Sequence, residues 1–302
     1  MSKLNRRRFL SISAAMAVAG TAMRAGTVSG LTVWRGVALG SGAQIALAHP
    51  DADVIILRAR AEIARLEEVF SLYSATSSLS TLNRLGLLQA PPFELLECLG
   101  IAGAVHQATK GRFDPTVQPL WAAYAQAATE GRAPVDLSKL AIGWDRVRYD
   151  EEAIVLDQGM AMTLNGIAQG YIADRVAVLL RAEGLQDVLI NTGEISGLGH
   201  APSGSGWPVA TPAGEVMLTN RAIATSSPSG TLLDANGKFG HILDPISRKP
   251  AAPIWQSVSI SAPSAALADA LSTAACLTKV KDEIAADLYD FRDVKLESAL
   301  PV

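Results

Sequence analysis

Residues 166–199 read GIAQGYIADRVAVLLRAEGLQDVLINTGEISGLG, and this stretch decides the class of fold. Its first half carries apolar residues at helical spacing and reaches Gly184, the kind of residue at which helices commonly end. Its second half, from Asp187, is an apolar strand that runs into a glycine-rich loop. The stretch therefore predicts a domain in which helices and strands are mixed.

The flanking segments follow the same mixed pattern. Residues 31–49 alternate well enough for two strands joined by a glycine turn, and residues 53–73 have the spacing of an amphipathic helix. A second helix is expected from Phe93 to Thr109, and residues 146–164 read as two short strands around an acidic turn. No regular strand–helix–strand period and no repeat orders these elements, so we expect an α+β fold with mixed, mostly antiparallel sheets and packed helices.

The charge of the chain argues against one class of function. The formal net charge is −3, but five of the 26 Lys and Arg residues precede residue 26, where no acidic residue occurs. The remaining chain carries 21 basic against 29 acidic residues, a formal charge of −8. Affinity for nucleic acid depends on neutralising phosphates with Lys and Arg, so nucleic acid is not an expected partner.

The first 25 residues have the pattern of an export signal. Arg6, Arg7 and Arg8 precede a short apolar stretch, and small residues follow it, as in twin-arginine signals. We expect residues 1–25 to be a twin-arginine (Tat) signal peptide, residues 26–302 to form a single domain, and the protein to be exported to the periplasm. A retained membrane anchor is the alternative, although the apolar run is too short for a bilayer of roughly 30 Å.

Cysteine usage leaves one question open. Cys98 and Cys276 both fall in apolar helical patterns and are expected to be small core residues. An oxidising compartment permits a disulfide between them, but two cysteines do not establish one.

The apolar stretch ALADALSTAACL, residues 266–277, carries Asp269, Ser272 and Thr273 in its middle. A helix is expected here with Ser264 at its start, and residues four apart then share a face. A buried carboxylate needs a cation, a donor or water, and a carboxylate beside a hydroxyl is half of a site for Mg²⁺. An exposed Asp on a surface helix is the alternative, and these residues alone leave both open.

Three other motifs are individually weak. In GHILDPISRKP, residues 240–250, His241 suits a general base or a phosphate ligand as well as simple turn hydrogen bonding. GRFDPTVQPLW, residues 111–121, predicts an ordered non-helical loop that either binds a planar ring edge or only connects two elements. The helix start in LNGIAQGY, residues 164–171, offers free N–H groups to an anion but fits neither GxGxxG nor the P-loop.

The order of these motifs is more specific than any one of them. Taken together, they resemble the signature segments of the ApbE family of FAD:protein FMN transferases, from about Gly36 to Leu277. The matching segments, in sequence order, are FSLYSATSSLSTLN, GRFDPTVQPLW, GIAQGYIADR, LINTGEI, AIATSS, HILDP and ADALSTA.

The resemblance implies an activity. Such a protein is an exported α+β flavin transferase that splits FAD at its pyrophosphate, with Mg²⁺ required. It moves FMN onto a Ser or Thr hydroxyl in the flavinylation motif of a membrane or periplasmic flavoprotein and releases AMP. Some relatives of this kind serve respiratory systems such as nitrous oxide reduction.

The resemblance also implies roles for individual residues. Asp269 and Thr273 match the metal ligands, and Gly166 matches the residue whose backbone carbonyl completes the protein part of the metal site. His241 matches a residue proposed to act in catalysis. The positions that match FAD contacts are Leu39, Tyr73, Arg112, Phe113, Asp114, Thr163 and Gln169, with Arg112 to Asp114 largely on the adenine side.

The chain departs from the family pattern at several positions. Thr163 stands where members commonly have Asp, Gln169 where they commonly have a charged residue such as Lys, and a single Gly193 precedes Glu194. Ser227, Pro228 and Ser229 replace the usual Gly-Asp-Tyr. An active transferase is still expected. A carrier that binds FAD without transferring FMN is the alternative favoured by the two lost charges, and a maturation scaffold without flavin is the third.

Overall fold

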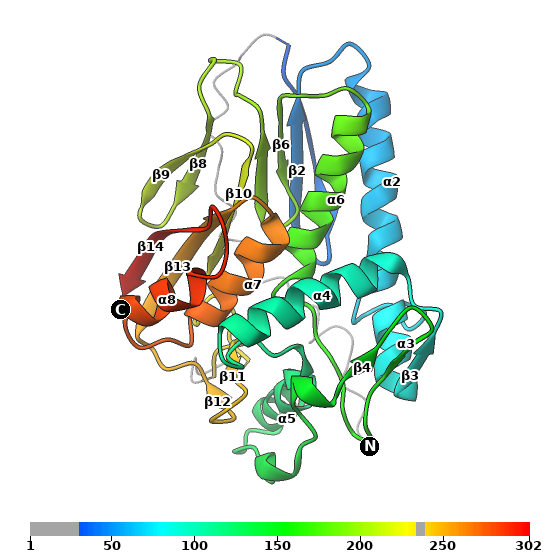
Figure 1. The fold of residues 1–302 in the computed structure, drawn as a ribbon, viewed down its shortest axis with the longest axis vertical. Helices are drawn as coiled ribbons and strands as arrows, with labels where there is room; N and C mark the ends of the chain where they lie inside the picture. The colour runs from blue at the N-terminus through cyan, green and yellow to red at the C-terminus, as the bar shows by residue number, and fades with distance from the viewer. Residues whose placement is uncertain (1–29, 234–238) are drawn as a thin grey trace.

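A seven-stranded antiparallel sheet forms the centre of the computed structural model, which describes residues 30–233 and 239–302 (Figure 1). Every neighbouring pair of strands is antiparallel, so the predicted α+β class is confirmed. In spatial order the strands are β1 (Thr32–Ala38), β2 (Ser41–Leu47), β6 (Val188–Asn191), β7 (Ile195–Leu198), β10 (Arg221–Ser226), β13 (Trp255–Ala262) and β14 (Lys295–Pro301).

The stretch 166–199 lies at the middle of this arrangement. It forms helix α6 (Ala168–Ala182), which ends before Gly184 at φ 87°, and then the β6–β7 hairpin. Strand β6 pairs with β2, and β7 pairs with β10, so the hairpin joins the N-terminal and C-terminal parts of the sheet. The local pattern of the sequence is thus confirmed, whereas these long-range pairings arise only in the folded chain.

Four helices cover one face of the sheet (Figure 1). They are α2 (Ala52–Phe70), α4 (Phe93–Ala108), α6 and α7 (Ala265–Ala275), and they contact one another in the main core. At the crossing of α6 and α7, a Cβ on Gly170 would lie 2.2 Å from the carbonyl oxygen of Ala265. Any side chain larger than hydrogen would therefore push the two helices apart.

A smaller apolar cluster lies on the opposite face, under the hairpin of β8 (Trp207–Thr211) and β9 (Gly214–Leu218). Side chains alternate across a strand, so Ala46 and Leu189 contact this cluster while their neighbours contact the main core. The indole N–H of Trp207 donates to the carbonyl of Leu198 at 2.7 Å, which fixes the hairpin against β7.

The rest of the described chain forms short elements below and beside the sheet. The two strands expected within residues 146–164 are present, and they pair through the acidic turn. These elements are α3 (Ser78–Leu85), β3 (Leu87–Gln89), α5 (Gln118–Thr129), β4 (Arg148–Tyr149), β5 (Ala153–Val155), β11 (Leu243–Asp244), β12 (Lys249–Pro250), α8 (Lys281–Leu288) and three short 3₁₀ helices (Pro115–Val117, Leu137–Lys139, Trp144–Arg146).

One local prediction was wrong. The segment 111–121 was expected to be non-helical, but a 3₁₀ turn occupies Pro115–Val117 and α5 begins at Gln118. Pro119 falls in the first turn of α5, where a backbone N–H has no intrahelical partner and its loss does not weaken the helix. The two prolines therefore start helical turns here instead of preventing them.

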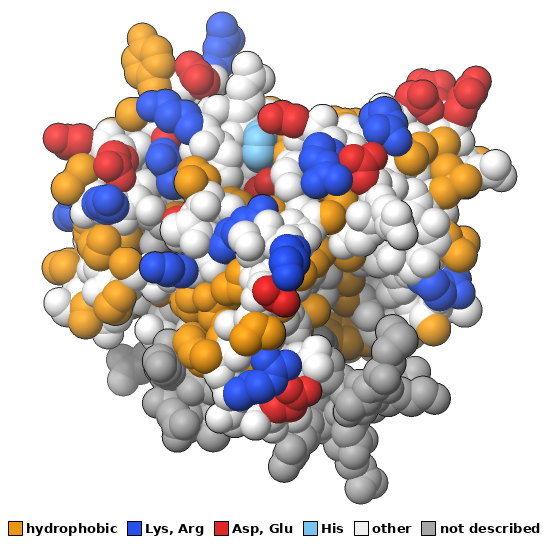
Figure 2. Space-filling model, turned by 90° about the horizontal axis from the view of Figure 1, so that it is seen from below, with side chains coloured by type: hydrophobic (Ala, Val, Ile, Leu, Met, Phe, Trp, Pro, Cys, Tyr) orange, Lys and Arg blue, Asp and Glu red, His pale blue; other side chains and the backbone are white. Residues whose placement is uncertain are grey.

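Both cysteines are buried and free, so the structure contains no disulfide between Cys98 and Cys276. Across residues 30–233 and 239–302, no helix combines the length and apolar character needed to cross a membrane. The signal peptide predicted for residues 1–25 lies outside the described residues. On the described part of the face in Figure 2, Lys and Arg side chains alternate with Asp and Glu side chains instead of forming a basic stripe.

Candidate active site

A cavity of about 700 Å³ lies between the start of α6, the C-terminal half of α7, the β6–β7 turn and the loop before α5. A volume of this size is typical of pockets that hold cofactor-sized ligands. The structure brings nine of the residues predicted from the sequence to its wall: Arg112, Phe113, Asp114, Thr163, Gly166, Gln169, His241, Asp269 and Thr273.

The other two predicted FAD contacts, Leu39 and Tyr73, are not part of this lining. Leu39 occupies the β1–β2 turn at φ 46°, and its N–H donates to Glu67 Oε1 at 2.7 Å. The neighbouring Ser41 does reach the cavity. Tyr73 follows α2 and is 36% exposed. Their roles toward FAD stay predictions.

The α7 wall of the cavity carries Asp269 and Thr273. Helix α7 begins as predicted, with the Ser264 hydroxyl accepting from the N–H of Leu267 at 3.3 Å. Asp269 is only 3% exposed, so the alternative of a surface Asp is wrong. The Oδ2 atom of Asp269 accepts from the N–H of Gly170 at 3.3 Å, and Thr273 lies one turn further along the same helix.

Gly166 faces Thr273 from the loop before α6. A Cβ on Gly166 would lie 3.0 Å from Thr273 Oγ1 and 3.4 Å from the Phe113 ring. The backbone at residue 166 therefore lies directly against the hydroxyl of Thr273. The three residues that the resemblance assigned to a metal thus line one cavity, and two of them are in contact.

Asp269 is a buried carboxylate without a counter-ion. No Lys, Arg or His in the described part of the chain forms an ion pair with it. Burial raises the pKa of Asp269 to about 8, and the nearby Asp174 adds to the rise, while the hydrogen bond from Gly170 opposes it. Such a carboxylate ionises readily only when a cation joins it, because an unpaired buried charge is strongly disfavoured.

The donors around Asp269 fit a hard divalent cation. A carboxylate, a hydroxyl and a glycine backbone are oxygen ligands of the type that Mg²⁺ takes, and Mg²⁺ usually keeps waters or substrate phosphates as its other ligands. Among the described residues there is no cluster of three or more His, Cys, Asp or Glu side chains that would cage a metal without a substrate. Ser257, which is 3% exposed and lines the same cavity, has a hydroxyl without a hydrogen-bond partner.

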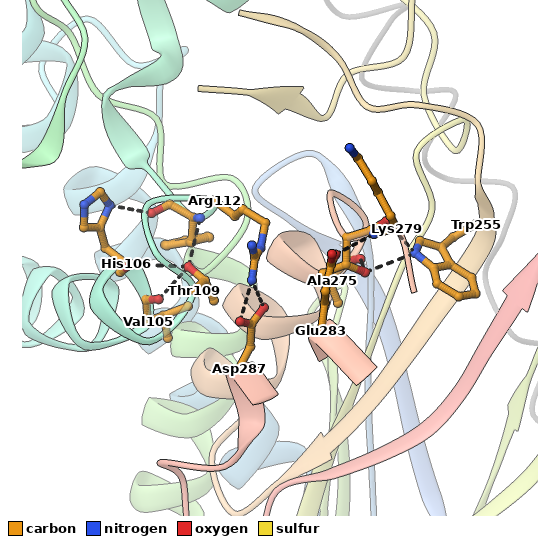
Figure 3. A network of polar contacts seen from close by, with 11 residues as sticks. Val105, His106, Thr109, Arg112, Trp255, Ala275, Lys279, Glu283 and Asp287 are labelled. Carbon is orange, nitrogen blue, oxygen red and sulfur yellow. Dashed lines mark hydrogen bonds and ion pairs between the residues drawn. The ribbon is translucent and has the colours of Figure 1, made fainter. Parts of the chain in front are cut away.

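The opposite wall, Arg112 to Asp114, has most of its polar groups bonded within the protein, although Arg112 Nε has no hydrogen-bond partner among the described residues. Figure 3 shows Arg112 reaching Asp287 of α8, whose two carboxylate oxygens accept from Arg112 Nη2 at 2.5 and 2.6 Å. The carbonyl of Phe113 is 2.8 Å from His106 Nδ1. Asp114 accepts from Thr116 N–H at 2.8 Å and from Trp144 N–H at 3.2 Å. These contacts hold the backbone of this wall in place.

The two substituted positions, Thr163 and Gln169, are also tied to neighbours. Gln169 Nε2 donates to Ser41 Oγ at 2.6 Å, and a Cβ on Gly193 would lie 2.5 Å from Gln169 Cδ. The N–H of Thr163 donates to the carbonyl of Pro115 at 2.8 Å. Neither side chain carries a charge into the cavity.

His241 presents a neutral imidazole to the cavity. Its Nδ1 lies 3.1 Å from the carbonyl oxygen of Thr231, and a carbonyl only accepts, so Nδ1 carries the proton. The other ring nitrogen, Nε2, is then the basic one. Burial lowers the pKa of His241, and the hydrogen bond to Thr231 opposes this only in part, so the imidazole stays neutral near pH 7.

Sequence reasoning missed two acidic residues at this site. Asp174 of α6 fixes the start of α7, because it accepts from the Ser264 hydroxyl and from the N–H groups of Ala265 and Ala266 at 2.7–2.9 Å. Glu194 lines the cavity next to Asp269. Both residues lie in segments that match the family, GIAQGYIADR and LINTGEI. An acid in a helical pattern or after a strand is usually exposed, so the residue pattern alone gave neither one a role.

The sequence profile of the ApbE family matches residues 26–290, which is most of the chain. The chain belongs to the ApbE family. The family resemblance of the seven segments is thereby confirmed, and the matched range begins directly after the predicted signal peptide.

Named ApbE relatives agree with this membership. The chain is 30% identical over 232 residues to the FAD:protein FMN transferase of Chlamydia pneumoniae, covering 69% of this chain and 71% of that relative. It is 28% identical over 229 residues to the enzyme of the same name from Haemophilus influenzae, covering 67% of this chain and 66% of that relative.

Solved ApbE structures share the fold. The apo flavinyl transferase ApbE of Pseudomonas stutzeri superposes with a TM-score of 0.76 at 23% identity, covering 89% of this chain and 95% of that one. The ApbE protein of Thermotoga maritima superposes with a TM-score of 0.77 at 24% identity, covering 86% of this chain and 91% of that one.

Proposed function

We propose that this ApbE protein transfers FMN from FAD to a Ser or Thr hydroxyl of an acceptor protein and releases AMP, in a reaction that requires Mg²⁺. The observation that carries the proposal is one cavity that is lined by a buried, unpaired carboxyl group, a neutral histidine and the ordered wall from Arg112 to Asp114. The names of the curated relatives support the reaction type, and the oxygen donors around Asp269 support the metal.

The residues of the cavity have separate tasks in this reaction. Gly166, Asp269 and Thr273 would hold the Mg²⁺, which when bound neutralises charge on the pyrophosphate of FAD. The wall from Arg112 to Asp114 orients the AMP half, which places the FMN phosphate toward α7. Phosphoryl transfer needs chiefly positioning and charge neutralisation, which is what these groups provide.

His241 handles the proton. The acceptor hydroxyl oxygen attacks the phosphorus of the FMN half, its proton passes to Nε2 of His241, and the bond from that phosphorus to the bridging oxygen breaks. AMP leaves with the bridging oxygen, and FMN remains joined to the acceptor by a phosphoester bond. A lowered pKa keeps His241 in the proton-accepting form at neutral pH.

A single assay tests the proposal. The protein without residues 1–25 is incubated with FAD, Mg²⁺ and an acceptor domain that carries a Ser/Thr flavinylation motif, and the acceptor mass and the released AMP are measured. A mass gain of one FMN with equimolar AMP, lost in EDTA, is the expected result. No mass gain with active acceptor overturns it.

A second function is favoured by one observation. Thr163 and Gln169 bring no charge to the cavity, and Gln169 is held by Ser41, which suits a carrier that binds FAD without transferring FMN. Tight FAD binding without acceptor modification would identify the carrier, and the absence of flavin binding would identify a scaffold.

We further propose that the protein acts in the periplasm, on a membrane or periplasmic flavoprotein. The arginine-rich start of the chain supports this location. Replacing Arg6 and Arg7 by Lys is expected to leave the protein in the cytoplasmic fraction of cells, and unchanged export would contradict the proposal.

A further inference from the structure

Glu194 stands at the tip of the β6–β7 hairpin and lines the cavity. Its Oε2 accepts from the N–H of Thr225 at 3.3 Å, across the pairing of β7 with β10. This is the only hydrogen bond of the Glu194 side chain among the described residues, and it uses one of two carboxylate oxygens. The side chain is therefore held at one point and has acceptor capacity left over.

Two independent sets of contacts bring Glu194 to the metal-binding face of α7. Thr225, which donates to Glu194, precedes Ser226, whose hydroxyl lies 3.3 Å from Thr273 Oγ1 and 2.7 Å from Ser272 Oγ. On the other side, Gly193 lies against Gln169, and the next residue of α6, Gly170, donates to Asp269.

Asp269 and Glu194 have no counter-ion within the described part of the protein. Asp269 raises the pKa of Glu194 beyond the rise caused by loss of water, so the two carboxylates repel each other. Among the described ion pairs, none brings a Lys, Arg or His to either one. Without a cation, two such neighbouring carboxyl groups stay protonated, and a bound divalent cation would allow both of them to ionise.

We propose that Glu194 is a second carboxylate of the cation site, so that Glu194 and Asp269 hold one divalent cation between them. This proposal rests on the proposed metal site of α7 and adds to it one ligand from the turn between β6 and β7. The unpaired hydroxyl of Ser257 in the same cavity is independent support for a ligand there.

The arrangement has a consequence for cation binding. With two carboxylates, the protein supplies more of the negative charge that compensates the cation, so cation binding depends less on the pyrophosphate of FAD. A site with Asp269 as its single carboxylate would instead depend on FAD to recruit the metal.

The test measures metal binding, not transfer. Mn²⁺ is titrated into the protein with and without FAD, and free Mn²⁺ is followed by electron paramagnetic resonance. We expect Glu194→Gln to weaken Mn²⁺ binding by about tenfold to a hundredfold in both conditions, in the range seen when groups at metal sites are replaced. Glu215→Gln, an exposed acid on the β8–β9 hairpin, is the matched control and leaves the affinity unchanged.

A stability measurement separates ligation from a structural role. Gln keeps an acceptor for the N–H of Thr225, so metal-free Glu194→Gln is expected to melt at or above the wild-type temperature. Its gain in melting temperature on adding Mg²⁺ should be smaller than that of wild type. Wild-type Mn²⁺ affinity and wild-type Mg²⁺ stabilisation in Glu194→Gln would overturn the proposal.

The Mn²⁺-binding test and the FMN-transfer assay can fail separately. Mn²⁺ binding that depends on Glu194 in a protein that transfers no FMN supports the second carboxylate and rejects the transferase. FMN transfer by a protein whose Mn²⁺ affinity does not depend on Glu194 does the reverse.

Discussion

The two walls of the cavity differ in how their charges are satisfied. On the wall formed by Arg112 to Asp114, the guanidinium meets Asp287 and the carboxylate of Asp114 accepts two backbone N–H groups. On the wall formed by α7 and the β6–β7 turn, Asp269 and Glu194 each accept one hydrogen bond at 3.3 Å and meet no cation in the described chain. The charged groups of the first wall are paired within the protein, whereas the two carboxyl groups of the second wall have no counter-ion among the described residues.

The contrast shows that the two walls contribute to binding in different ways. A satisfied wall is rigid before binding and contributes orientation, since its groups need no rearrangement. A wall with unpaired buried carboxyl groups lowers the stability of the metal-free protein, and cation binding should stabilise it more than the other wall. Each of the following variants either breaks one wall or makes the two walls more alike.

Replacing Asp269 by Asn is expected to have the largest effect. Transfer should fall by about a thousandfold or more, because the metal contributes several kcal/mol to such reactions. The metal-free protein should keep its melting temperature, since burial holds the Asp269 carboxyl group protonated near pH 7 and Asn replaces it with another neutral group. Acceptor mass and thermal unfolding measure the two effects, with exposed Asp282→Asn as control. Full Mg²⁺-dependent transfer in Asp269→Asn would reject the metal assignment.

His241→Ala is expected to lower transfer by at least about a hundredfold, the usual size of a general-base effect. Because burial lowers the pKa of His241, wild-type activity should stay flat down to about pH 6.5, the ordinary value for His, and fall only below it. The unfolding free energy should fall over the same acidic range, since the unfolded chain takes up a proton that the folded chain refuses.

The pH profile provides the check on this assignment. Transfer rates are measured from pH 5 to 8 for wild type and His241→Ala at saturating FAD. A variant that keeps the acidic fall in activity would show that another group titrates.

Asp287→Asn tests the wall formed by Arg112 to Asp114 and should have an intermediate effect on stability and FAD binding. Arg112 loses its charged partner, so we expect a loss of about 1–3 kcal/mol in the free energy of unfolding. FAD affinity should fall several-fold while Mn²⁺ affinity stays constant, because α8 does not touch the cation site. Fluorescence titration with FAD and with FMN measures this, and equal weakening for both flavins would contradict an adenine-side role for Arg112.

Gln169→Lys should have the smallest effect on stability. It gives the second wall a cation of its own, as Arg112 pairs with Asp287 on the first. A cation next to the unpaired carboxylates is expected to raise the free energy of unfolding of the metal-free protein by about 1 kcal/mol. Mg²⁺ should then stabilise the variant less than wild type. Gln169→Met is the uncharged control of similar length, and the same melting curve for both variants would contradict the expected pairing.

The local elements of the fold were predictable because their signals lie within a few residues of one another. The helix starting at Ser264, the end of α6 at Gly184 and the strands around the acidic turn all follow from spacing and capping. The segment 111–121 was mispredicted because a proline reads as a helix breaker unless its position in the first turn is known.

Leu39 and Tyr73 show what a motif leaves undetermined, and their roles toward FAD stay predictions. A motif gives a position in the chain, whereas the distance of that position from the cavity depends on the β1–β2 turn and on the end of α2. The structure places both residues outside the cavity lining, whereas Ser41 and Gly42, which follow Leu39 in the chain, are part of it.

By itself, the sequence determined the α+β class, the helix faces, the family and nine of the cavity-lining residues, because periodicity, caps and ordered motifs are properties of the chain alone. Only the tertiary structure decided that Asp269 is buried, that Arg112 is paired with Asp287, and that Glu194 faces the same cavity. The physical reason is that burial and charge balance are set by partners many residues away. Gly170 shows this directly, because its missing side chain lets α6 and α7 approach and thereby encloses Asp269.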